Sequence, residues 1–412
     1  MTLFLRLSLL LAATASAVDA HSLFTTLHIN DQDQGDGTCI RMPKEPSTAT
    51  NPVEDLQDPA MVCANVLAGF DGTNGVQRVC KTPQGSTLGF EYHTYPDRSQ
   101  EGSIEPSHKG PCAVYMKAVP SASEASGEGE GWFKVWEQGY DSSSKKWCSD
   151  NIIDNNGIMN VQLPSDLAGG EYLVRSELLA LHEADKSPPN PQFYVGCAQI
   201  YLDSQANAAP PPDTTVSIPG HVKISDPSVL FNIYTPSWPY TMPGPRVYSN
   251  GVPSENRQTS RSENRDLPPR TIAVNANWYG TEQEPYNTES GCWTATTNCF
   301  QQAHSCYSTS PPTGSKGCRV YEKKCTKMQQ ACGSGNFNGP PDQGQVLTPG
   351  IKDFHGSQST AAYSGNDTLP LNPLFILYFH TLGLRAERRA TREFKELGDA
   401  LQLIPGCCGK RI

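Results

Sequence analysis

The cysteines constrain this chain more than any other feature of its sequence. Fourteen of them occur in 412 residues, a content typical of an oxidising compartment rather than a reduced one. Six precede residue 198, six lie between residues 292 and 332, and the last two are adjacent at 407 and 408. The long stretch without cysteine between the first two groups predicts two separately cross-linked modules. Zinc binding is the alternative, but the sequence contains no C-x2-C pair.

The second group of cysteines has the spacing C-x6-C-x6-C-x11-C-x6-C-x6-C. Seven residues are nearly two turns of an α-helix, so each triplet lies along one helix face. The segment SPPTGSKG at 310–317 breaks the chain between the triplets and predicts an antiparallel helical hairpin. A segment this small needs covalent cross-links, such as disulfides between the two helices, to be stable. Metal ligation by these cysteines is the alternative to the bridges that we expect, Cys292–Cys332, Cys299–Cys325 and Cys306–Cys318.

Composition and period-two patterns predict that the first module is mainly β. Glycine and proline number 35 and 34, and 18% of the residues are charged, which favours a loop-rich β protein over a helical bundle. Alternating apolar residues, separated by Gly, Pro, Asn and Asp clusters, predict strands at 88–92, 112–116, 132–136, 158–163, 171–181, 193–202 and 229–233. We expect an antiparallel β-sandwich of the immunoglobulin or fibronectin kind, with long loops, over residues 21–248.

The remaining segments differ from this module in composition. Their composition predicts a linker over residues 249–275 and the Cys-rich helical-hairpin module over 276–347. The last segment, 348–412, is a tail to which we assign no function. Asn366 begins the single N-x-[ST] glycosylation sequon. The net charge of −10 argues against nucleic-acid and anionic-membrane partners. The apolar run at 373–379 is too short to span a bilayer.

Residues 1–20 have the pattern of a secretory signal peptide, with Arg6, an apolar run and small residues at the end. Cleavage after Ala20, which we favour over cleavage after Ala17, makes His21 the first residue of a secreted protein. A free N-terminal histidine chelates a metal through its α-amino group and ring Nδ1, because this amine gives up its proton to a metal at modest cost. Nitrogen-only, tetragonal ligation suits Cu(II).

Several separated motifs together resemble one known family. They are HSLFTTLHIN directly after the signal, IRMP at 40–43, SHKGPCAVYM at 107–116, GWFKVWEQGYD at 131–141, RSELLALHEA and PQFYVGCAQIYL between 175 and 202, and YTMPGP at 240–245. Over residues 21–248 the chain resembles the fungal cellulose-active lytic polysaccharide monooxygenases, formerly classed as a glycoside hydrolase family.

This resemblance implies a site for one copper ion. In that family two histidines hold the ion through three nitrogens: the mature N-terminus, here His21, and the histidine of Ser-His-x-Gly-Pro, here His108. The tyrosine of Gln-x-Tyr, here Tyr194, supplies an axial oxygen. Gln192 and His182 match residues that act beside the metal on the oxidant. The pattern itself adds that Gln192 and Tyr194, two apart on a predicted strand, share a face.

The resemblance also implies the reaction and the partners. The enzyme would use O2 or H2O2, with electrons from an external small reductant or a secreted dehydrogenase, to oxidise C1 or C4 of a β-1,4-glucan such as cellulose and so break the chain. We expect it to act as a monomer. Neither the attacked carbon nor a preference for cellulose over hemicellulose follows from the sequence.

Aromatic residues near the end of the first module are candidates for substrate contact. Tyr240 matches a family position on the substrate-facing surface, and Tyr234 and Trp238 are further candidates, because aromatic rings stack on sugar faces. Packing of the closing loop is the alternative. His28 and His93 match no role, so we interpret them as structural. The family's most regular bridge and the cysteines that remain imply the pairs Cys80–Cys197, Cys112–Cys148 and Cys39–Cys63.

Three other functions stay open. A glycoside hydrolase needs two carboxylates at a set separation, which one sequence cannot place. A non-catalytic copper-binding surface protein on the same two histidines would lack the aromatic face and often the Gln-x-Tyr pair, and both are present here. A cellulose-binding accessory protein without redox activity is the third.

Overall fold

The computed structural model describes residues 21–43, 45–64, 75–249, 251–253 and 267–348. The signal segment, the Asn366 sequon and nearly all of the tail lie outside the described residues. Within the described ranges, no helix has both the length and the apolar content that a membrane crossing requires.

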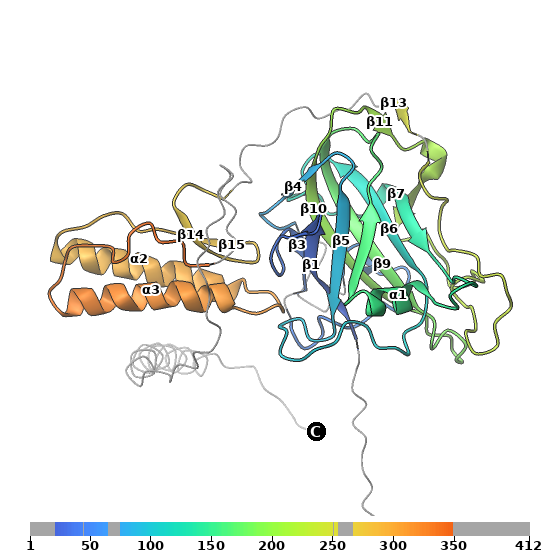
Figure 1. The fold of residues 1–412 in the computed structure, drawn as a ribbon, viewed down its shortest axis with the longest axis horizontal. Coiled ribbons are helices and arrows are strands. Elements are labelled where there is room, and N and C mark those ends of the chain that lie inside the picture. The colour runs from blue at the N-terminus through green and yellow to red at the C-terminus, as the bar shows by residue number, and fades with distance from the viewer. Residues whose placement is uncertain (1–20, 44, 65–74, 250, 254–266, 349–412) are drawn as a thin grey trace, which may run out of the picture. The chain divides into compact units, whose positions relative to one another are not determined.

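Two sheets form the first module (Figure 1). The smaller sheet has the antiparallel order β2-β1-β5-β8, with β1 (Leu23–Ile29), β2 (Gln32–Asp33), β5 (Thr87–His93) and β8 (Ile158–Gln162). The larger sheet has the order β12-β7-β6-β9-β10-β3, and β4 runs parallel to β10. Its strands are β3 (Ile40–Arg41), β4 (Cys80–Pro83), β6 (Cys112–Val119), β7 (Gly129–Gln138), β9 (Gly170–Ala180), β10 (Gln192–Asp203) and β12 (Thr215–Ile218). The predicted sandwich is confirmed.

Short elements decorate the sandwich. They are the helix α1 (Cys148–Asp154), the 3-10 turns Pro59–Met61 and Pro212–Thr214, and the strand pair β11 (Ala208–Ala209) and β13 (Val252–Pro253).

The central strands β9 and β10 are buried on both faces. All 11 residues of β9 and 11 of the 12 residues of β10 are buried. One face packs against the smaller sheet through residues such as Phe24 and Phe90, and loops that contribute Met61 and Val229 cover the other face. Buried aromatic side chains of this kind are worth about 3–5 kcal/mol each against alanine. The two strands therefore form a firm base for the side chains at their ends.

The strand predicted at 229–233 is wrong, because the chain there is loop. Val229 and Phe231 are buried in the cluster on the outer face of the larger sheet, so their alternation comes from packing and not from strand pairing. Asn232 then turns the chain, since its Oδ1 accepts from the backbone N–H of Tyr234 at 2.8 Å and of Thr235 at 2.9 Å.

The sandwich disulfides differ from those that the family resemblance implied. The bridges are Cys39–Cys80 and Cys63–Cys197, so the predicted pairs Cys80–Cys197 and Cys39–Cys63 are wrong. Alternation along β10 is the reason: Cys197 points to the loop-covered face together with Cys63, whereas Cys39 and Cys80 belong to the core between the sheets. The third bridge, Cys112–Cys148, is present as predicted.

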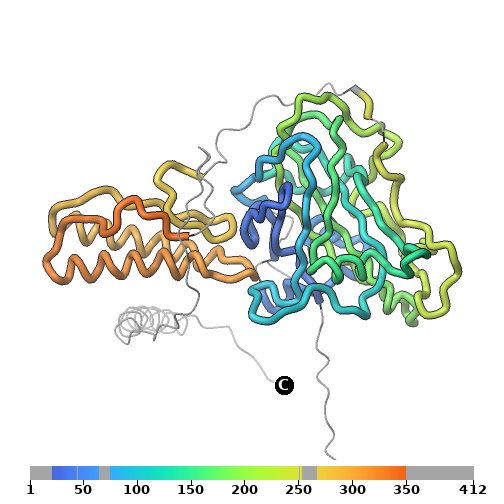
Figure 2. The backbone as a smooth tube through the Cα atoms, in the orientation of Figure 1, coloured from blue at the N-terminus to red at the C-terminus, as the bar shows by residue number. Residues whose placement is uncertain are grey.

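The second module is the helical hairpin that the cysteine spacing predicts. Its helices are α2 (Glu289–Ser308) and α3 (Lys316–Gly333), and the chain reverses between them (Figure 2). The side chain of Thr288 caps α2 by accepting from the N–H of Gly291 at 3.1 Å. Three bridges join the helices at Cα–Cα distances of 5.8, 5.4 and 5.5 Å: Cys292–Cys332, Cys299–Cys325 and Cys306–Cys318.

A two-stranded sheet precedes these helices, with β14 (Thr271–Asn275) and β15 (Trp278–Thr281). Ile272 and Ala273 join the helices' small core, in which Tyr321 and Met328 are fully buried. The predicted linker 249–275 therefore includes ordered chain at both ends, because β13 pairs with β11 of the sandwich and β14 belongs to the hairpin module.

His28 and His93 lie on either side of Glu91 in the smaller sheet. The Nε2 atoms of His28 and His93 are each 2.7 Å from an oxygen of Glu91, and Nη2 of Arg98 is 3.0 Å from one of them. Burial by itself would raise the pKa of Glu91, but the hydrogen bonds from both imidazoles and the charge of Arg98 hold it well below its usual value. The hydrogen bond to Glu91 raises the pKa of His28. These contacts support the structural interpretation of both histidines.

We expect Glu91→Gln to lower the free energy of unfolding by about 1–3 kcal/mol, between the values for exposed and fully buried ion pairs. The depressed pKa of Glu91 gives a contribution that is present above the ordinary value of 4.5 and lost at lower pH. The raised pKa of His28 gives a second contribution to the free energy of unfolding. That contribution is fully present below pH 6.5 and is lost as pH rises through the raised pKa. The effect should therefore be largest between pH 4.5 and 6.5. Urea unfolding across this range tests it, with the exposed Glu101→Gln as control, and a pH-independent difference would contradict it.

Candidate metal centre

Three rings from separate parts of the chain meet at one end of the sandwich. His21 lies just before β1, His108 in the loop before β6, and Tyr194 on β10. The ring centroids are 6.4 Å apart for His21 and His108, 6.1 Å for His21 and Tyr194, and 5.7 Å for His108 and Tyr194. The structure thus brings together the three residues that the sequence proposes as copper ligands.

Strand pairing places His182 at the same end. Ala180 and Gln192 form the last backbone pair between β9 and β10, and the chain turns from one strand to the other after this pair. His182 therefore lies just after the end of β9. The backbone N–H of Leu181 bonds the carbonyl of Lys109 at 2.9 Å, which fixes the neighbouring His108 alongside. The rings of His108 and His182 are consequently 4.1 Å apart.

The polar atoms of these histidines suit a metal. Nδ1 of His21, the ring nitrogen that an N-terminal chelate uses, is buried without a hydrogen-bond partner among the described residues, and so is Nδ1 of His182. An unsatisfied buried polar group costs about 1–3 kcal/mol, which metal coordination by His21 would offset. Nδ1 of His108 lies 3.1 Å from the hydroxyl of Ser107, so Nε2 remains as its ligand atom.

Both imidazoles beside His21 are held in the neutral form at neutral pH. Burial, followed by the charges of His182 and His21, lowers the pKa of His108 to about 4. Burial also lowers the pKa of His182. A metal binds neutral imidazole, so His108 has no proton to lose when it binds one at neutral pH.

Gln192 and Tyr194 share one face of β10, as their spacing predicts. The hydroxyl of Tyr194 donates to Oε1 of Gln192 at 2.9 Å, and both side chains are buried. This bond uses the oxygen of the carboxamide and leaves its NH2 group as a donor. Gln192 therefore lies beside the three rings as a positioned hydrogen-bond donor.

The donor set differs from that of common hydrolytic sites. The described part of the chain contains no group of three His, Cys, Asp or Glu side chains arranged for a metal, so a site here depends on two imidazoles, a phenol and the backbone amine. Glu183, next to His182, bonds Lys186 and Asn190, and the bond from Lys186 lowers its pKa. A glycosidic general acid needs a raised pKa, so Glu183 does not fit that role.

The three aromatic candidates have different surroundings. Tyr234 is 64% exposed, and its hydroxyl donates to the carbonyl of His182 at 3.1 Å. Trp238 is 46% exposed and stacks on Tyr140 at 4.1 Å. Tyr240 is only partly exposed, because its ring packs edge-on against Trp147 at 4.9 Å and its hydroxyl donates to a backbone carbonyl. Tyr234 and Trp238 thus present exposed rings to a substrate, whereas Tyr240 packs beneath the surface against Trp147.

Sequence reasoning missed two features near this site. Tyr140 forms the stack with Trp238, and its place in the motif GWFKVWEQGYD was the available signal. Arg175 and Glu177 form a buried ion pair on the outer face of β9, and Nε2 of His221 lies 2.9 Å from the carboxylate of Glu177. Two charged residues inside a predicted strand, two apart, were the signal for that pair.

Comparison with known proteins agrees with the geometry. Residues 21–241 match the model of Auxiliary Activity family 9, formerly GH61. The chain is 52% identical over 347 residues to the AA9 family lytic polysaccharide monooxygenase H of Botryotinia fuckeliana, covering 81% of this chain and 78% of the relative. It is 45% identical to the AA9 family lytic polysaccharide monooxygenase C of Aspergillus tamarii, covering 85% of this chain and 94% of the relative.

A solved structure titled CvAA9A is 33% identical and covers 55% of this chain and 98% of its own, with a TM-score of 0.49. The family match covers more than half of the chain and includes all the residues that converge at the metal centre. The chain therefore belongs to Auxiliary Activity family 9, the lytic polysaccharide monooxygenases.

Proposed function

We propose that the mature protein begins at His21 and holds one copper ion through the α-amino group and Nδ1 of His21 and Nε2 of His108, with the phenol of Tyr194 beside it. The single observation that supports this most is the buried, unpartnered Nδ1 of His21, whose ring centroid lies 6.4 Å from that of His108 and 6.1 Å from that of Tyr194. Copper bound there would supply one-electron chemistry with an external reductant and O2 or H2O2.

The substrate that fits this face is a β-1,4-glucan such as cellulose, oxidised at C1, C4 or both. The exposed rings of Tyr234 and Trp238 support this choice, because aromatic faces stack on sugar rings. The bond from Tyr234 to the carbonyl of His182 ties this surface to the centre. Gln192 would orient groups beside the metal through its free NH2, and His182 would hold or release a proton there.

We further propose a secreted monomer in three parts: the sandwich domain from 21 to 248, the hairpin module from 276 to 347, and a tail. Every cysteine in the described residues is paired in one of six disulfides, which supports export to an oxidising compartment. The electron donor is external, either a small molecule or a secreted dehydrogenase.

Mass spectrometry of soluble products from swollen cellulose tests the function. With copper and ascorbate we expect oligosaccharides carrying an oxidised C1 or C4 end, and with either omitted we expect none. Native, unoxidised oligosaccharides would instead indicate hydrolysis. Tight copper binding without any product would leave a non-catalytic copper protein.

We expect Gln192→Ala and His182→Ala to lower oxidative activity by about 10–100-fold, the usual effect of groups that orient a metal's ligands. Both variants should keep the copper affinity of the wild type, because neither residue is a proposed ligand. Calorimetric copper titration and product release measure the two effects, with the exposed Gln329→Ala and His304→Ala as matched controls. Loss of copper from either variant would make that residue a ligand.

A further inference from the structure

A polar hollow of about 500 Å3 lies on the hairpin module, and none of the residues of the metal centre lines it. One wall is the segment 281–284, which begins at the last residue of β15, and the other is a stripe on α2 made of Asn298, Gln301, Gln302 and Ser305. We call these eight residues the polar hollow. Every one of them has a polar side chain, and the volume is within the range of ligand sites in proteins.

The stripe on α2 has the spacing of one helix face. Its members are three, four and seven residues after Asn298, so their side chains point in the same direction. Amide and hydroxyl groups both donate and accept hydrogen bonds. The wall therefore presents a row of neutral groups of mixed hydrogen-bonding character.

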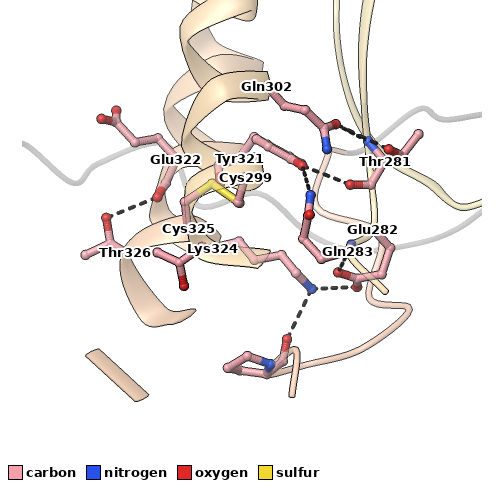
Figure 3. Close-up of a disulfide and its surroundings, with 12 residues drawn as sticks. Thr281, Glu282, Gln283, Cys299, Gln302, Tyr321, Glu322, Lys324, Cys325 and Thr326 are labelled. Carbon is pink, nitrogen blue, oxygen red and sulfur yellow. Dashed lines mark hydrogen bonds and ion pairs between the residues drawn. A yellow bond between two sulfur atoms is a disulfide. The ribbon is translucent and has the colours of Figure 1, made fainter. Parts of the chain in front are cut away.

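The hollow is held in place by fixed contacts (Figure 3). Oε1 of Gln302 accepts from the backbone N–H of Thr281 at 2.9 Å and lies 3.3 Å from its hydroxyl, which orients the carboxamide and leaves its NH2 as a donor. The Cys299–Cys325 bridge fixes α2 to α3 less than one turn from Gln302. A preorganised site loses less entropy when a ligand binds.

A buried ion pair anchors the opposite wall. Nζ of Lys324 lies 2.6 Å from Oε2 of Glu282, with side-chain exposures of 4% and 3%, and also donates to the carbonyl of Pro341 at 3.1 Å (Figure 3). The hydroxyl of Tyr321 donates to the carbonyl of Thr281 at 2.8 Å. Buried pairs add little net stability, and this one holds the side chain of Glu282 against α3.

The charges of the hollow are compensated. Glu282 pairs with Lys324, and Glu284 pairs with Arg270. The lining is therefore close to neutral, which matches neither a metal ion nor an anionic group. It matches a ligand with many uncharged groups that each donate and accept, which is the character of sugar hydroxyls. No residue with an apolar side chain lines this hollow, although aliphatic carbon atoms of the polar residues form part of its surface.

We propose that the polar hollow binds a short segment of a neutral oligosaccharide chain, independently of the metal centre. The hollow is a shallow, open depression, so the chain would lie along it and not be enclosed. No aromatic ring lines it, so binding should be weak, with a dissociation constant of about 1 mM. The hairpin module would then keep soluble or loosened chains close to the enzyme.

Nuclear magnetic resonance of the full chain, with cellohexaose as the probe and no reductant, tests this. We expect saturable shifts of the side-chain amide signals of Asn298 and Gln302. Removal of one hydrogen bond in Gln302→Ala or Asn298→Ala should raise the dissociation constant for the remaining signals of the hollow by about fivefold. The exposed Gln329→Ala on α3, outside the hollow, should leave it unchanged.

Three results would overturn the proposal: no shift in the hollow at millimolar probe, wild-type affinity in both Gln302→Ala and Asn298→Ala, or equal shifts with a hexapeptide of glycine and asparagine. Should Gln302→Ala disturb the loop at Thr281, the exposed Asn298→Ala still decides the matter, because Asn298 makes none of the anchoring bonds described above. Shifts near Tyr234 and Trp238 report on the metal face instead, so failure of the proposed function and failure of this site are distinguishable.

Discussion

His108→Ala is expected to weaken copper binding by more than about 100-fold and to abolish oxidative cleavage. Changes to groups around a metal site that are not its ligands typically cost about 10–100-fold in affinity or activity, and the loss of a ligand itself, as proposed for His108, should cost more. Its pKa is lowered to about 4, chiefly by burial, so the wild-type ring binds metal without proton release at neutral pH. Without Nε2 of His108, the proposed donors that remain are the α-amino group and Nδ1 of His21 and the phenol of Tyr194.

Copper titration and the nitrogen hyperfine pattern of the Cu(II) EPR spectrum measure this effect. The matched control is His304→Ala, an exposed histidine on α2. Unchanged nitrogen coupling in His108→Ala would show that His108 is not a copper ligand. A wild-type protein whose first residue is Val18 would remove the chelate at His21, and N-terminal sequencing checks this.

Loss of the Cys63–Cys197 bridge in the double variant Cys63→Ala/Cys197→Ala is expected to cost about 5 kcal/mol of unfolding free energy. The bridge joins residues 134 apart in sequence, and the entropy that a cross-link removes from the unfolded chain grows with loop length. It also fixes the covering loop to the outer face of β10, the strand that carries Gln192 and Tyr194.

Urea unfolding followed by tryptophan fluorescence measures this loss. Cys306→Ala/Cys318→Ala, which opens a bridge of separation 12 in the hairpin module, is the control and should leave the sandwich transition in place. An unchanged midpoint for the Cys63→Ala/Cys197→Ala variant would contradict the pairing, and so would a Cys80–Cys197 peptide in a non-reducing map.

Local sequence patterns were sufficient to predict those features that depend on spacing within a single helix or strand. The seven-residue spacing of six cysteines fixes which faces of two helices meet, and the three bridges follow from it. Likewise, two residues apart on one strand must share a face, so the Gln192–Tyr194 contact could be predicted. The strands at 171–181 and 193–202 were predictable because their apolar residues alternate and clusters of Gly, Pro, Asn and Asp separate them from their neighbours.

Patterns failed where two different structures produce the same alternation. Val229 and Phe231 alternate because a loop covers the core, not because a strand pairs there. Cys80 and Cys197 lie on strands that run side by side, yet their side chains point to opposite faces. The face on which a side chain lies depends on register, and register is set by contacts between distant segments.

By itself the sequence determined the hairpin and its bridges and the mainly β class, since each rests on spacing within one segment. The candidate ligands His21, His108 and Tyr194 came from the resemblance of separate motifs to a known family. Only the tertiary structure decided which faces Cys39, Cys63, Cys80 and Cys197 occupy, which aromatic rings remain exposed, and that Glu282 meets Lys324 beneath the polar hollow. These depend on long-range packing, because burial and charge pairing are fixed only when segments far apart in sequence come together.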